Sequence, residues 1–314
     1  MPPVIRSALI ALLLLAAPAA AQVPEAPLLA EVLVVGRPPG PPLWRVQRGG
    51  AEVLVLGTVS PVPHLLDWDE TRLERHLARA DRLLLPPEVK VGALDAARMF
   101  VGQGALKLPG RATLEATLPE PLRVRFVAAR ERALKPAARY ARWKPAVAGF
   151  LVLSDWREAA GLSMAKPAST VRRMAKGRRL KVRTVAAYRL APLARSAAGL
   201  SAEAHLVCLD AALRQNDAEG AHARTVAQAW AEGDLRTVRR LYDPLLLDAC
   251  LAQAPAADAL VRRGVADTAA AIEASLRDGG TAVAVVDLAL LLRPDGVLER
   301  LRAGGATVSA PADG

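Results

Sequence analysis

The 314-residue sequence has few aromatic side chains, two cysteines and four histidines. Two cysteines are too few for a structural zinc site, which takes four cysteine or histidine ligands. The histidines are scattered as His64, His76, His205 and His222. We interpret His64 as a loop residue and the other three as surface or core-edge residues of separate helices. After residue 17 no apolar run reaches the roughly 20 residues that cross a bilayer, which predicts no transmembrane segment in the mature chain.

The N-terminus has the three parts of a secretory signal. Arg6 supplies the positive charge, residues 8–17 form an unbroken apolar run, and Ala19-Ala20-Ala21 provides the small residues that signal peptidase requires. We therefore expect a signal peptide over residues 1–21, with cleavage between Ala21 and Gln22. No cysteine lies near this position, so a lipoprotein anchor is not indicated. The mature protein is expected to be periplasmic or secreted.

Export changes the interpretation of the two cysteines. Cys208 and Cys250 would meet an oxidising compartment, where an even number of cysteines favours a disulfide. The alternative is two separate buried thiols.

The order of predicted elements is typical of an α/β protein. A Pro-rich leader or linker covers residues 22–42 and includes a short predicted strand, Leu29–Val35. We expect a mixed, largely parallel sheet flanked by helices, with a large helical insertion at about residues 90–250. The predicted strands are 44–46, 51–58, 82–85, 180–185, 281–287 and 306–309. The predicted helices outside the first part of the insertion are 69–80, 201–214, 221–241 and 297–303.

Several stretches resemble the TraB/GumN family over residues 43–310. The first is Leu43-Trp44-Arg45-Val46 followed by Gly57-Thr58-Val59-Ser60 and Trp68, similar to the family's LW-x-V, GT-x-H and Trp. Ala80–Leu85 is similar to AD-x-L-x-L-E, and Ala229–Leu235 to W-x-x-GD-L. The last runs from Val283 through Asp295-Gly296 to Val308. The resemblance implies a mixed α/β fold.

Some relatives resemble metal-dependent peptidases, which use two G-x-x-H motifs and a Glu after the second strand. The resemblance therefore implies three ligand positions, and this chain departs from the pattern at each of them. Ser60 and Leu290 stand where the histidines would be, and Pro86 stands in place of the Glu. Asp287 replaces the Gly of the second motif. Because a hydroxyl is a poor ligand and the Pro and Leu side chains offer none, we expect no metal and no other cofactor.

The positions around these departures define a candidate cleft. Its residues are Gly57, Thr58, Ser60, His64, Trp68, Pro86, Glu88 and Asp287. The first hypothesis is a binding or accessory protein of the cell envelope. The second is a peptidase-like hydrolase whose altered cleft pairs Asp287 with Glu88. A role in extracellular polysaccharide production is suggested only by the family relationship.

Two stretches are strongly basic. Residues 123–144 hold eight cationic side chains against Glu131 alone, and residues 166–183 hold eight against none. They are interpreted either as solvated helix faces or as contacts for an anionic polysaccharide or an envelope lipid. Nucleic acid is not expected, because the protein leaves the cytoplasm and the stretches lack regularly interleaved aromatics for base stacking.

Overall fold

A computed structural model describes residues 40–90, 92, 102–243 and 246–311. The predicted signal peptide, most of the Pro-rich leader and the predicted strand Leu29–Val35 lie outside this part of the chain. The strands are β1 Leu43–Arg48, β2 Ala51–Thr58, β3 Val62–Pro63, β4 Arg82–Leu85, β5 Glu88–Lys90, β6 Leu162–Ser163, β7 Lys181–Thr184, β8 Ala187–Arg189, β9 Thr281–Asp287 and β10 Thr307–Ser309.

The principal sheet of the described residues has the order β10-β1-β2-β9-β4-β7. The strands β2, β9, β4 and β7 are parallel, whereas β1 is antiparallel to both β2 and β10. β2 and β9 form its centre and are apolar along most of their length, as expected for parallel strands covered on both faces. The predicted α/β class with a mixed, largely parallel sheet is therefore confirmed.

Most of the helices lie between β4 and β9, whereas α1 precedes β4 and α12 and α13 follow β9. Together with two 3-10 segments, Gln103–Leu106 and Ala137–Arg139, they are α1 Thr71–Arg79, α3 Leu114–Thr117, α4 Glu120–Arg132, α5 Pro145–Ala159, α6 Lys166–Met174, α7 Ala191–Ala198, α8 Ala202–Ala231, α9 Leu235–Leu241, α10 Asp248–Gln253, α11 Pro255–Arg277, α12 Leu288–Leu291 and α13 Val297–Ala303. None of the described helices is long and apolar enough to cross a membrane.

Helix α8 differs from the two shorter helices predicted for its region. Ser201 caps it as expected by accepting the N–H of Ala204, but the helix then continues for 30 residues. Asn216 and Glu219 lie between the two predicted helices, yet both side chains are buried and bonded to arginines of α4 and α5. Tertiary contacts thus sustain a helix through residues that local sequence favours as a loop.

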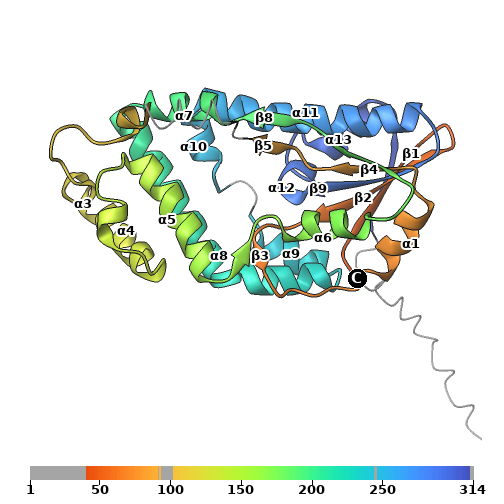
Figure 1. Cartoon of the computed structure of the whole chain (residues 1–314), viewed down its shortest axis with the longest axis horizontal. Coiled ribbons are helices and arrows are strands. Elements are labelled where there is room, and N and C mark those ends of the chain that lie inside the picture. The colour runs from red at the N-terminus through yellow and green to blue at the C-terminus, as the bar shows by residue number, and fades with distance from the viewer. Residues whose placement is uncertain (1–39, 91, 93–101, 244–245, 312–314) are drawn as a thin grey trace, which may run out of the picture. The chain divides into compact units, whose positions relative to one another are not determined.

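The buried apolar residues of the described fold form two large clusters. The first lies around the sheet, where α11 covers one side and α1, α6 and α9 cover the other (Figure 1). The second joins α3, α4, α5 and the first half of α8, and Phe126 packs edge-on against Tyr140 at its centre. Since α8 contributes to both clusters, it connects the helical insertion to the sheet.

A disulfide joins α8 to α10. Cys208 and Cys250 are 2.05 Å apart at their sulfur atoms and both are buried beside Ala146 and Ala211. The predicted bridge is therefore present, and it closes a loop with a sequence separation of 42.

Removing this bridge should destabilise the protein mainly by enlarging its unfolded ensemble. For C208A/C250A we expect a free energy of unfolding lower by about 3–4 kcal/mol, measured by denaturant titration. A reducing agent should lower the stability of the wild type and leave the variant unchanged. Equal stability of oxidised and reduced wild type would contradict this account.

Candidate functional site

The candidate cleft lies at the carboxyl ends of the central parallel strands. Thr58 ends β2 and is paired in register with Asp287, which ends β9. The Thr58 hydroxyl donates to the carbonyl of Val286 across the same strand pair, at 3.4 Å. Ligand sites of α/β sheets are found at such strand ends, because the following loops meet there.

Gly57 and Trp68 contribute to packing below this edge. A Cβ atom on Gly57 would lie 2.3 Å from the ring of Trp44 and 2.6 Å from the side chain of Leu288. The Gly57 carbonyl accepts the indole N–H of Trp230 at 2.6 Å, and Trp68 packs edge-on against Trp230 with ring centroids 5.0 Å apart. Glycine is required here by the close approach of these side chains.

Ser60 and His64 lie on the segment that follows β2. The Ser60 hydroxyl donates to the carbonyl of Met164 at 3.2 Å. His64 is exposed, and its backbone accepts a hydrogen bond from Lys166 and donates one to Gly161. Ser60 also lies close to the carboxylate of Asp287, so the structure brings these two predicted residues together.

Pro86 and Glu88 lie where a parallel strand pair is interrupted. Pro86 and Pro87 cannot donate backbone hydrogen bonds, and they separate the β4–β7 pair from its continuation, β5 with β8. The carboxylate of Glu88 binds Arg172 and the hydroxyl of Thr184, and the hydrogen bond from Arg172 lowers the pKa of Glu88.

Asp287 has a different set of contacts. Its Oδ1 accepts the N–H of Ala289 at 2.8 Å and caps α12, and it also accepts the hydroxyl of Tyr242 at 3.3 Å. Burial raises the pKa of Asp287, and the hydrogen bonds from Ala289 and Tyr242, with the nearby Ser60 hydroxyl, only partly oppose this shift. The paired-carboxylate hypothesis needs Asp287 and Glu88 to lie close together. Among the described residues, no hydrogen bond or shared partner joins these two carboxylates.

Tyr242 also faces a small cavity of about 30 Å³ beside this cluster. The space suits one or two water molecules. Its polar lining residues are Ser60, Gln215, Glu219, His222, Tyr242 and Asp243. Glu219 is buried and bound by Arg157 at 2.8 Å and by Gln215 at 2.7 Å. Burial and the neighbouring charge of Asp287 raise the pKa of Tyr242 well above its usual value.

The contribution of α8 to this cavity was not predicted from the sequence. Gln215, Glu219 and His222 are spaced by four and three residues, which places them on one helix face. This spacing is visible in the sequence. It was not recognised because Gln215 and Glu219 lie between the two predicted helices, 201–214 and 221–241. Within the described ranges, no three side chains of His, Cys, Asp and Glu are grouped so that they could hold a metal ion.

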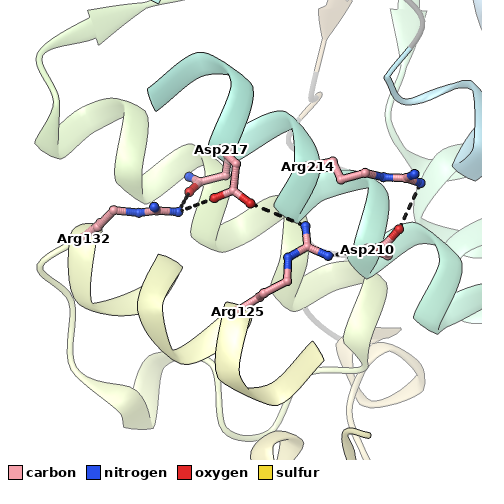
Figure 2. A network of polar contacts seen from close by, with 6 residues as sticks. Arg125, Arg132, Asp210, Arg214 and Asp217 are labelled. Atoms are coloured by element: carbon pink, nitrogen blue, oxygen red, sulfur yellow. Dashed lines mark hydrogen bonds and ion pairs between the residues drawn. The ribbon is translucent and has the colours of Figure 1, made fainter. Parts of the chain in front are cut away.

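The cations of the basic stretch 123–144 form ion pairs and hydrogen bonds with other residues of the fold. Figure 2 shows Arg125 and Arg132 of α4 reaching Asp210 and Asp217 of α8, with Arg214 also bound to Asp210. The other cations of the stretch also have partners: Arg123 with Glu120, Arg130 with Glu115, Lys135 with Glu158, Arg139 with Asp155, Arg142 with three backbone carbonyls, and Lys144 with the carbonyl of Ala198. These residues therefore bind the helical insertion together.

The basic stretch 166–183 has a different arrangement. Arg172 and Arg178 form ion pairs with Glu88 and Glu74. Four further side chains are exposed and have no hydrogen bond or ion pair with any residue that the structure describes: Lys176, Arg179, Lys181 and Arg183. We call these four residues the cationic strip. It runs from the end of α6 along β7, the edge strand of the sheet.

A family model described as the TraB/PrgY/gumN family matches residues 42–310. The match thus covers the sheet, the helical insertion and every residue of the candidate cleft. No curated protein and no solved structure matches the chain.

The close packing around Gly57 predicts that a side chain at this position lowers the stability of the protein. In G57A the added methyl group must displace Trp44 or Leu288, so we expect a loss of about 1–3 kcal/mol in the free energy of unfolding. The matched control is G104A, where a Cβ would meet nothing within 4 Å. A G57A protein as stable as G104A would show that the site tolerates a side chain.

The two carboxylates should give opposite pH profiles. The pKa of Asp287 is raised in the folded protein, so its contribution to stability is present at low pH and is lost as pH rises through the folded pKa. The free energy of unfolding of wild type relative to D287N should therefore fall from acid to neutral pH. The pKa of Glu88 is lowered, so the same difference measured against E88Q should rise over that interval. Parallel profiles for the two variants would contradict the assignment.

Proposed function

Because the chain belongs to the TraB/PrgY/gumN family, we propose that it is an exported cell-envelope member that binds an anionic partner. The partner is an anionic polysaccharide or an envelope lipid, and the role is binding or accessory rather than metal-dependent hydrolysis. The periplasmic or secreted location of this proposal is supported by the signal-like pattern of residues 1–21 and agrees with the buried disulfide.

The observation that carries the proposal is the cationic strip. Of the two basic stretches, only residues 166–183 retain several cations that are exposed and lack a partner in the described chain. Several neighbouring cations attract polyanions and anionic surfaces. Near an anionic membrane, each Lys or Arg contributes about 1 kcal/mol to the free energy of binding.

The altered ligand positions support a role without a resident metal. Ser60 binds a backbone carbonyl, Pro86 interrupts a strand pair, and Leu290 lies within the apolar helix α12. Asp287 is held by a helix N-terminus and by Tyr242. These side chains are engaged in the fold and present no set of donors suited to a divalent ion.

The test compares two triple variants that each remove three positive charges. R179Q/K181Q/R183Q changes the cationic strip, and R111Q/R263Q/R302Q changes three exposed arginines elsewhere. We expect the first variant to bind vesicles containing phosphatidylglycerol about a hundredfold more weakly, from about 3 kcal/mol of lost attraction. It should also elute from immobilised heparin at lower salt, whereas the control variant should resemble the wild type.

Two results would overturn the proposed function. One is equal loss of binding in both variants, which would indicate an unspecific effect of net charge. The other is a stoichiometric, tightly bound transition metal in the purified mature protein, measured by elemental analysis.

A further inference from the structure

Strand β7 ends the principal sheet, and one of its two backbone edges has no partner strand among the described residues. Lys181 and Val185 donate their backbone N–H groups to carbonyls at either end of β4, at 2.9 Å and 3.0 Å. Because the backbone groups of successive residues in a strand point to opposite sides, the N–H and C=O groups of Val182 and Thr184 point away from β4. In the part of the chain that the structure describes, no hydrogen bond satisfies these outward groups.

The outer edge of β7 is also open to solvent. Lys181, Val182 and Arg183 are all exposed, and Val182 is 47% exposed although its side chain is apolar. Unpaired N–H and C=O groups on an exposed edge are the template on which an added strand forms its hydrogen bonds. The backbone of β7 can therefore pair with an extended peptide.

The side chains of β7 restrict which peptide can pair there. Lys181 and Arg183 are two residues apart, so they project on the same face of the strand, about 7 Å from each other. A peptide with acidic side chains at every second position would place them opposite these two cations. Cross-strand pairs of opposite charge are stabilising, so the edge favours an acidic strand.

A second copy of this chain fits the same edge poorly. In an antiparallel pairing centred on Val182, Lys181 of each copy would face Arg183 of the other. Like charges directly opposite each other in a sheet are destabilising, and charged edges of this kind prevent self-association. The charges that repel a second β7 are the ones that attract an acidic segment.

We propose that β7 binds an extended acidic segment of a protein partner, which joins the sheet as a further strand. The backbone of the segment pairs with Val182 and Thr184, and its Asp or Glu side chains contact Lys181 and Arg183. The inference goes beyond the proposed function, because strand pairing requires a polypeptide. A polysaccharide or a lipid at the cationic strip would be attracted by the charges without adding a strand.

The experiment separates strand pairing from attraction of charge. Two synthetic octapeptides carry the same charge: one repeats Glu-Val, and the other repeats Glu-Pro, which lacks an N–H at every second residue and favours polyproline II. Their affinities for the protein are measured by isothermal titration calorimetry. V182P removes one outward N–H of β7 and no bond to β4, and V182A is the matched control that keeps this donor. Circular dichroism establishes that each variant is folded.

We expect the wild type to bind the Glu-Val peptide about tenfold more tightly than the Glu-Pro peptide, since each backbone hydrogen bond adds modestly to the affinity. V182P should lose most of this preference, whereas V182A should retain it. K181Q/R183Q should weaken the binding of both peptides. Retention on heparin should be the same for V182P and the wild type, because their charges are equal.

Equal affinity of the wild type for the two peptides would overturn this inference and leave the proposed function intact. If V182P does not fold, that comparison on the wild type decides alone. A wild type that prefers the Glu-Val peptide but binds neither heparin nor phosphatidylglycerol vesicles would support the inference and overturn the proposed function.

Discussion

The parallel pairing of β2 with β9 is the constraint on which the rest of the structure depends. It joins Thr58 to Asp287 across most of the sequence and places both at the same edge of the sheet. The pairing needs a side-chain-free residue at Gly57, because Trp44 and Leu288 close over that position. It also fixes the Gly57 carbonyl, which receives the indole N–H of Trp230 and so attaches α8 to the sheet.

From this attachment α8 extends into the helical insertion and meets α4 and α5 through ion pairs and hydrogen bonds. Arg157 and Glu219 are largely buried as a bidentate pair, and Arg125 and Arg132 reach the same helix from α4. Such pairs contribute modestly when exposed, but a buried partner left alone would be costly. The cations of residues 123–144 therefore determine how the insertion packs, and they are occupied in doing so.

At the carboxyl ends of the central strands, the buried polar side chains are bonded to neighbours within the fold. Asp287 caps α12 and accepts the hydroxyl of Tyr242, while Glu219 is bound by Arg157 of the neighbouring helix α5. The remaining cavity is about 30 Å³. Interaction with a partner is accordingly proposed for the cationic strip, whose side chains face solvent.

The sequence by itself determined the α/β class, the central strands, the cap at Ser201 and the family, because these follow from local periodicity, capping chemistry and motifs at fixed spacing. It also identified the two cysteines that pair. Only the tertiary structure decided that α8 continues through Asn216 and Glu219, that Tyr242 reaches Asp287, and which basic stretch keeps cations without a partner among the described residues. Each of those outcomes depends on partners far away in the chain, and the two basic stretches hold the same number of cations. What distinguishes the stretches is the position of acidic residues and carbonyls brought close by folding.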